Sequence, residues 1–551
     1  MSSPNIYTRR SFLTQSFKTG LGIAVASLAD VPMVVKRALA DGGIGLNGKK
    51  LLFIFLRGAN DGINTLIPVG DSAYGTGIRP SLAMPLDTAG GFYTSPGACF
   101  DATRFADAFG TLRAASDATY SFAKAIPTGN GFAALHPSLK FLAPAYNAGQ
   151  LALLHRVGYP KQSRSHFDSQ NYWENGTPNN NLIKDGIFYR TLLESGLAAT
   201  NPLTGVSIQS ALPLLLRGDQ AAMTNLSNVG RYALLGVPGI TGLDKSENAL
   251  RSAQEFAFAS KQNRELLKLQ YANLLNTLPL FEQIATLMDV NYVDNADTDG
   301  DFPYPLFPVS NATNGGYTRP GGGTDANKYV VDTSAYNSEG TGFFQRLKAA
   351  TLVLNKTDAI IAGTEMGGFD THSNQGTTAG NHPNLLRRIG WAFYALRKYF
   401  LHHGDRATWN NLVVVTLSEF GRATIENSDN GTDHAEASVM FVGGGGIRGW
   451  DGLGRSGVLG CHTGDTVPWI PGPANQSGGV DGSLFGVGNV YLKRAIDYRS
   501  VLGELIRDHL GATQGQLTRI IPGYANAGEK LLAGGASSVD SVPIIGELNL
   551  V

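Results

Sequence analysis

The chain has 551 residues, of which 42% are hydrophobic and 16% are charged, and its 44 acidic residues balance 44 basic ones. This composition supports a real core, and the length predicts either two domains or one domain with large insertions. The chain contains no long basic run or basic stripe, which argues against nucleic acid as a partner.

Residues 1–40 have the features of an export signal. Arg9 and Arg10 precede a moderately apolar stretch, and a small-residue cleavage pattern ends at Ala40. These features are typical of a twin-arginine signal peptide, and the apolar stretch is too short to span a bilayer stably. We therefore expect the twin-arginine translocase to export residues 41–551 to the periplasm or the cell exterior, with no stable membrane span. The alternative is an ordinary amphipathic helix.

Five segments contain continuous apolar runs, which are typical of strands buried on both faces. In chain order they are Leu51–Pro68, Leu151–Pro160, Asp358–His372, Asn411–Gly421 and Ala437–Gly446. Segments with helical spacing of apolar residues lie between or after them: His136–Gly149, Thr341–Thr357, 382–404 and Arg499–Gly511. This alternation predicts an α/β fold with a mostly parallel sheet and helices on both faces. Residues 244–340 interrupt it, and we interpret them as a helical cap with a surface loop inserted into one domain.

Polar side chains gather where the predicted strands end. Because ligands bind at the carboxyl ends of strands in open α/β sheets, these side chains are expected to share one edge. In chain order they are Asp61, Arg164, Ser165, His166, Asp370, His372, Glu419, Arg422, Asp433 and His434. Carboxylates with imidazoles suit Zn²⁺ or Mn²⁺, and oxygen-rich sites suit Mg²⁺ or Ca²⁺. A serine beside such metals can act as a nucleophile.

Each of these residues also has a plainer interpretation. Ser165, with Asp168 three residues later, fits a helix cap, which is compatible with a nucleophile at the same position. Asp61 could simply form a turn. Glu419 at the end of a buried strand needs a partner, and Arg422 could provide it in a structural ion pair. Taken singly, the histidines would more often be structural.

Four motifs together resemble a known family: "FLRGANDGINTLIP", "RSHFDSQNYWENG", "GGFDTHSNQ" and "SEFGRATIENSDNGTDHAEAS". The family is an exported, largely uncharacterised bacterial family, the domain of unknown function numbered 1501, and the resemblance covers roughly Lys49 to Leu510. That family is similar in fold to the alkaline phosphatase and sulfatase superfamily. The resemblance implies an alkaline-phosphatase-like α/β/α sandwich with a mostly parallel central sheet, a helical insertion and two metal sites.

The resemblance also implies roles for individual residues. Ser165 resembles the nucleophile at a helix N-terminus, and Arg422 would hold an anionic substrate oxygen. The implied metal ligands are Asp61, Asp370, His372, Glu419 and His434, of which Asp370, His372 and His434 form one site. The expected cofactor is Zn²⁺, with a second, oxygen-ligated ion such as Mg²⁺, Mn²⁺ or Ca²⁺.

The chain departs from the superfamily pattern after the fourth strand. Where Asp-His is usual, this chain has Glu419 and Phe420, so the second site loses an imidazole. His166 could replace it, a different metal could bind there, or the site could be empty. The formylglycine sulfatase signature is absent at Cys99, Cys461 and Ser165, which argues against a standard sulfatase.

Two functions follow as expectations. The first is an exported metal-dependent hydrolase of phosphate or sulfate esters, with a serine nucleophile at the metal site. The second is a non-catalytic exported metal-binding protein with the same fold, acting in surface assembly or binding. Cys99 and Cys461 could form one disulfide in an oxidising compartment, but the sequence does not show that they meet.

Overall fold

The structure is a computed structural model of the chain. It describes residues 43–84, 125–198, 203–221, 223–227, 284–289, 291–292, 294, 305–309, 338–451, 455–472, 491–522, 524, 531–532 and 536–551. The predicted signal peptide, Cys99 and most of the predicted insertion at 244–340 lie outside these residues. Cys461 lies inside them and is a buried free cysteine.

One large sheet dominates the described part of the chain. Its strands follow the order β13-β14-β12-β5-β10-β9-β1-β8-β6-β7, and β11 pairs with β5. The five predicted strands are confirmed as β1 (Lys50–Leu56), β5 (Leu151–Gly158), β8 (Ile361–Met366), β9 (Leu412–Ser418) and β10 (Ser438–Gly443). The other strands are short: β6 (Gly205–Ile208), β7 (Thr224–Leu226), β11 (Val458–Leu459), β12 (Ile496–Asp497), β13 (Ala536–Val539) and β14 (Val542–Ile545).

The sheet is mostly parallel, as predicted. β1 pairs in parallel with both β8 and β9. β10 runs antiparallel to both of its neighbours, β5 and β9, and β13 runs antiparallel to β14. Because β10 is antiparallel to its neighbours, its first residues lie at the same edge as the carboxyl ends of β1, β5, β8 and β9. A small second sheet consists of β2 (Leu66–Ile67), β3 (Ile126–Pro127) and β4 (Ala134–Leu135).

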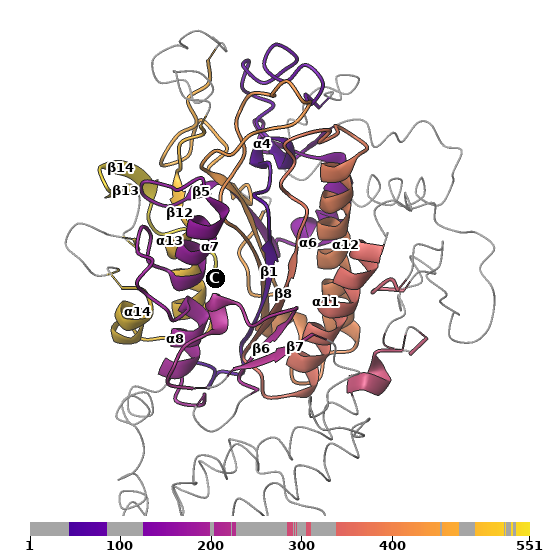
Figure 1. Cartoon of the computed structure of the whole chain (residues 1–551), viewed down its shortest axis with the longest axis vertical. Helices are drawn as coiled ribbons and strands as arrows, with labels where there is room; N and C mark the ends of the chain where they lie inside the picture. Colours follow the sequence, from indigo (N-terminus) through magenta and orange to yellow (C-terminus); the bar gives the residue numbers. More distant parts are fainter. Residues whose placement is uncertain are drawn as a thin grey trace, which may run out of the picture.

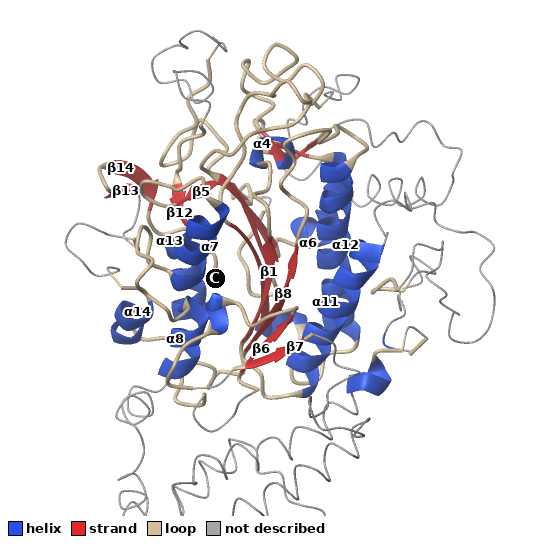
Figure 2. Cartoon of the chain, viewed as in Figure 1, coloured by secondary structure: helices blue, strands red, loops and turns tan. Residues whose placement is uncertain are grey.

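Helices cover both faces of the large sheet (Figures 1 and 2). One layer contains α7 (His166–Asn175), α8 (Ile187–Glu194), α13 (Tyr498–Glu504) and α14 (Gln514–Ile520). The other contains α6 (Ala143–Asn147), α11 (Ser338–Lys356) and α12 (Asn381–His402). Short elements complete the set: α4 (Gly62–Thr65), the 3₁₀ turns η2 (Pro137–Leu142), η3 (Leu214–Leu216) and η7 (Trp409–Asn411), and the π-helical turn η8 (Leu505–His509).

The packing of strand β1 explains why its apolar run is continuous. Leu52 and Ile54 belong to one hydrophobic core, with side chains of α11 and α12, whereas Leu51 and Phe53 belong to a second core, with side chains of α8 and α13. Successive side chains of a strand point to opposite faces, so a strand covered on both sides must be apolar at every position.

The predicted helices are present, with two differences. The segments 341–357 and 382–404 correspond to α11 and α12. The segment His136–Gly149 is a 3₁₀ turn followed by the short helix α6, and Arg499–Gly511 begins as α13 and continues as a π-helical turn. In the part of the chain that the structure describes, no helix is long and apolar enough to cross a membrane.

Candidate metal centre

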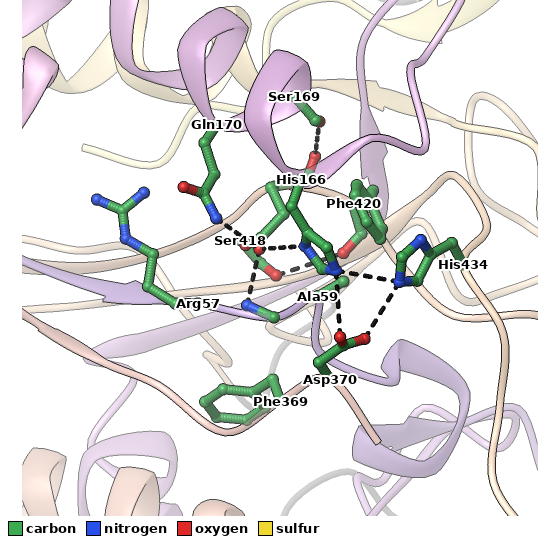
Figure 3. Close-up of polar contacts among 12 residues, drawn as sticks. Arg57, Ala59, His166, Ser169, Gln170, Phe369, Asp370, Ser418, Phe420 and His434 are labelled. Carbon is green, nitrogen blue, oxygen red and sulfur yellow. Dashed lines mark hydrogen bonds and ion pairs between the residues drawn. The ribbon is translucent and has the colours of Figure 1, made fainter. Parts of the chain in front are cut away.

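Four side chains converge at the carboxyl edge of the sheet, and we call them the His–Asp cluster: His166, Asp370, His372 and His434. Figure 3 shows His166, Asp370 and His434. His166 is the first residue of α7, after β5. Asp370 and His372 follow β8, and His434 precedes the antiparallel strand β10. The cluster therefore depends on three separate connections between elements, which only the folded sheet brings together.

His434 lies at the centre of this cluster. Its Nε2 atom is 3.0 Å from Nε2 of His166, 2.9 Å from Nε2 of His372 and 3.1 Å from Oδ1 of Asp370. The Asp370 carboxylate also lies 3.2 Å from Nε2 of His372 and 3.5 Å from Nε2 of His166. The Nε2 atoms of His166 and His372 thus both contact Nε2 of His434 and lie near the Asp370 carboxylate.

The opposite nitrogen of each imidazole contacts a hydrogen-bond acceptor. Nδ1 of His166 lies 2.9 Å from Oε1 of Glu419. Nδ1 of His372 lies 3.0 Å from Oδ1 of Asp433, and Nδ1 of His434 lies 2.9 Å from the carbonyl oxygen of Arg164. An acceptor at Nδ1 favours the tautomer that carries its proton there, which leaves Nε2 as a lone pair. In this tautomer Nε2 is the nitrogen that can bind a metal ion, and metal-binding histidines share this use of Nδ1.

Glu419 lies behind His166 and is fully buried at the end of β9. Its Oε1 atom accepts hydrogen bonds from the amide of Gly58 at 2.7 Å and from Nε2 of Gln170 at 3.1 Å, in addition to its contact with His166. Burial raises the pKa of this carboxyl, but the hydrogen bonds outweigh it and lower the pKa. The carboxylate is therefore an anion, and its hydrogen bond raises the pKa of His166. The sequence predicted Glu419 as a direct metal ligand, and in the structure its carboxylate contacts Nδ1 of His166.

Arg422 is buried and contacts Asp370. Its guanidinium donates to the carbonyl oxygens of Ala59 and Thr432, both at 2.9 Å, and also to those of Gly58 and Phe369 and to the Asp370 carboxylate. Burial raises the pKa of Asp370, but the guanidinium outweighs it and lowers this pKa to about 2. The arginine therefore pairs with Asp370 and not with Glu419, the partner considered from the sequence, and its donors are engaged within the protein.

Asp61 is not part of the His–Asp cluster. It is fully buried, and Arg79 binds both of its carboxylate oxygens, at 2.6 and 3.2 Å. Gln375 donates to Oδ2 at 2.6 Å, and Oδ1 caps helix α4. Burial raises the pKa of Asp61, but Arg79 outweighs it and lowers the pKa. Asp61, which the sequence predicted as a metal ligand, is thus paired with an arginine in the structure.

Ser165 is the N-cap of α7, as its spacing to Asp168 predicted. Its hydroxyl accepts the hydrogen bond of the Asp168 amide at 3.5 Å, which is a long contact. It lies between two residues that touch the cluster, since His434 contacts the carbonyl of Arg164 and His166 is a cluster member. Ser165, the nucleophile predicted from the sequence, is therefore next in the chain to residues that contact or belong to the cluster.

Phe420 is buried beside the cluster, with its ring centre 4.8 Å from those of His166 and His434. The sequence lacks an imidazole at this position, and the ring of His166 from α7 lies beside Phe420 in the structure. Sequence reasoning named His166 only as one possible substitute. The signal for it was present, since it directly follows a helix cap at the same edge of the sheet.

The cluster fits a divalent transition metal. Among the described residues, His166, Asp370 and His434 each offer a ligand atom, and these atoms lie within 4.8 Å of one another. Ligands about 2.1 Å from a tetrahedral Zn²⁺ are about 3.4 Å apart, which is close to the observed spacing. The side chains of Asp370 and His372 are 45% and 43% exposed, so the centre is open to solvent on that side.

The fold and this cluster define the chain as a mixed α/β protein with a candidate metal centre at the carboxyl edge of its sheet. Residues 324–467 match the model of a family described as "Protein of unknown function (DUF1501)". This match includes Asp370, His372 and His434, and it ends C-terminal to β10. No curated protein matches the chain.

Proposed function

We propose that the chain is an exported metal-dependent hydrolase of phosphate or sulfate esters. The observation that carries this proposal is that His166, Asp370 and His434 each offer a ligand atom within 4.8 Å of the others, with His372 in contact with His434. Imidazole with carboxylate is a donor set that suits Zn²⁺. His166, Asp370 and His434 would hold the ion, with His372 beside them.

The chemistry that a divalent ion supplies in such a site is polarisation of the ester and a lower pKa for a nearby hydroxyl. The protein's own groups prepare the site. Glu419 fixes the ring and tautomer of His166, and Arg422 keeps Asp370 ionised and aimed at the histidines. Phe420 excludes water from the buried side of the two rings it contacts.

Ser165 is the nucleophile in this proposal. Attack by its Oγ atom forms a bond to the phosphorus or sulfur atom of the ester. The bond from that atom to the leaving oxygen breaks, and the leaving oxygen takes the electron pair and, in the end, the serine proton. Water then hydrolyses the serine ester, releases phosphate or sulfate, and restores the hydroxyl.

The proposal includes the finer features expected from the sequence. These are an alkaline-phosphatase-like α/β/α sandwich over residues 41–551, an inserted cap at about 244–340, and export through the twin-arginine translocase. The mostly parallel sheet with helices on both faces supports the first of them. A second, oxygen-ligated ion has less support, because Arg79 already neutralises Asp61.

One observation favours the alternative, a non-catalytic exported metal-binding protein. The His–Asp cluster offers four donor groups, and four protein ligands are typical of structural Zn²⁺ sites, whereas catalytic sites keep one position open. In that case the ion would stabilise the loops at this edge of the sheet, and the protein would act in surface assembly or binding.

The test combines metal analysis with an ester panel. We expect the folded chain to contain one divalent ion and to hydrolyse an aryl phosphate or aryl sulfate. Ser165→Ala should lower this turnover by several orders of magnitude while the ion remains bound. Bound metal without turnover of any ester would support the non-catalytic alternative, and a chain that binds no divalent ion contradicts both functions.

A further inference from the structure

Arg164 contacts the His–Asp cluster through its backbone and presents an uncommitted guanidinium. Its backbone is fixed there, because its carbonyl oxygen lies 2.9 Å from Nδ1 of His434. The residue is exposed, and it directly precedes the N-cap of α7. In the part of the chain that the structure describes, its guanidinium has an electrostatic neighbour in Glu436 but forms no hydrogen bond or ion pair.

An aromatic ring holds this guanidinium in place. The Cζ atom of Arg164 lies 4.2 Å from the centre of the Tyr491 ring. A guanidinium over an aromatic face is held through its flat side, so the N–H donors around its rim remain available. The side chain is therefore partly oriented before any ligand binds, and its donors can still form a bidentate contact.

Two other described cations at this edge, Arg422 and Arg57, are committed to protein groups. The guanidinium of Arg422 is surrounded by carbonyl oxygens and Asp370. Arg57 is paired with Glu174 at 2.7 Å and with Glu365 at 3.0 Å. Arg164 differs from both because no carboxylate is within ion-pair distance of it among the described residues.

We propose that Arg164, and not Arg422, binds the anionic group of the substrate. Its rim donors match two oxygens of a tetrahedral oxyanion, the chemistry shared by phosphate and sulfate esters. In this role Arg164 is a substrate-binding residue that selects for anionic esters, and it holds the oxyanion next to Ser165. This inference rests on the proposed hydrolase function.

The test measures the binding of inorganic phosphate and inorganic sulfate to the metal-loaded chain by calorimetry. Loss of a charged hydrogen-bond contact weakens binding about 10- to 100-fold, and this loss is expected for Arg164→Ala. Arg164→Lys should recover part of the affinity, because it restores the charge without the bidentate geometry. The metal content of both variants should equal that of the wild type. Lys161→Ala is the matched control, since Lys161 is an exposed cation three residues away that faces Asp540.

The outcomes separate the two proposals. If the metal-loaded wild type binds neither anion, the hydrolase proposal fails and this inference fails with it. If it binds phosphate or sulfate and Arg164→Ala binds that anion equally well, the inference alone is overturned. If Lys161→Ala weakens anion binding as much as Arg164→Ala does, general surface charge explains the weaker binding. If Arg164→Ala loses the metal ion, a change in the cluster explains it. Either result also overturns the inference.

Discussion

The Nε2 atom of His372 lies 2.9 Å from the Nε2 atom of His434, and the two atoms lie 3.2 and 3.1 Å from the same oxygen of Asp370. The two histidines nevertheless have different surroundings. The side chain of His434 is 26% exposed, whereas that of His372 is 43% exposed and is backed by Asp433, which is 63% exposed. His372 is also outside the group whose ligand atoms all lie within 4.8 Å of one another.

This difference predicts that His372 is dispensable for holding the ion. His372→Ala should retain one divalent ion per chain with weakened affinity, and His434→Ala should lose the ion, because His434 contacts every other member of the cluster. Metal content after dialysis against a weak chelator measures both effects. If both variants lose the ion, the centre has four required protein ligands, and the non-catalytic function becomes the better interpretation.

Glu419 provides a second prediction. Glu419→Gln keeps the shape of the side chain but removes the anion that fixes His166, so the affinity for Zn²⁺ should fall about 10- to 100-fold. Competition with a chromogenic chelator measures this affinity, and circular dichroism checks that the fold is retained. The matched control is Glu426→Gln in the same loop, because Glu426 accepts hydrogen bonds from the amides of Ser81 and Leu82, away from the cluster. Unchanged affinity in Glu419→Gln would show that the buried carboxylate does not support the metal centre.

Much of the fold could be predicted from the sequence because burial on both faces makes a strand continuously apolar. That signal identified β1, β5, β8, β9 and β10. It could not identify β12, which has two residues, or β6, which has four, since such short segments carry no readable period. The antiparallel direction of β10 was also unreadable, because a strand's apolar pattern is the same in either direction.

The candidate site was predictable to a similar extent. Asp370, His372 and His434 followed from the rule that parallel strands present their ends at one edge. The environment of Asp61 did not follow, because Arg79 reaches it from 18 positions later, through a loop whose path depends on tertiary contacts. The hydrogen-bond partners of Arg422 could not be predicted for the same reason. Most of its acceptors are main-chain carbonyls, which every residue has, so no residue type in the sequence indicates them.

A third prediction concerns pH and a buried histidine beneath the site. Burial lowers the pKa of His382 from 6.5 to about 4. The folded pKa is below the unfolded one, so the unfolded chain binds more protons once the pH falls below about 6.5. The stabilisation from neutral His382 is therefore complete above that pH and is lost progressively as the pH falls toward 4, by up to about 1.4 kcal/mol per pH unit.

His382→Gln should remove this dependence, because the amide does not titrate and can still donate to the side-chain oxygen of Asn60, which is 2.9 Å from Nε2 of the native ring. Calorimetric unfolding of the chelator-treated protein between pH 4 and pH 7 measures the effect without interference from metal release. We expect the midpoint of the wild type to fall more steeply than that of the variant. Parallel curves for the two proteins would contradict the assignment.

A substitution at Asp61 tests most directly whether this residue is a metal ligand or the structural partner of Arg79. The resemblance to the two-metal superfamily implies that removing its charge costs a metal ion. The structure implies a different loss, because Arg79 is fully buried and would be left without its counter-ion. Breaking a buried pair on one side costs about 3–5 kcal/mol, so Asp61→Asn should lower the free energy of unfolding by that amount. The metal content should stay unchanged.

Urea unfolding and elemental analysis of the same preparation measure both quantities, with Asp370→Asn as the comparison. Asp370 is partly exposed and lies in the His–Asp cluster, so Asp370→Asn should lose the ion at a smaller cost in stability. The reverse pattern, in which Asp61→Asn loses metal and remains as stable as the wild type, would restore Asp61 as a ligand. It would also require Arg79 to move aside when the ion binds, since the guanidinium now contacts both carboxylate oxygens.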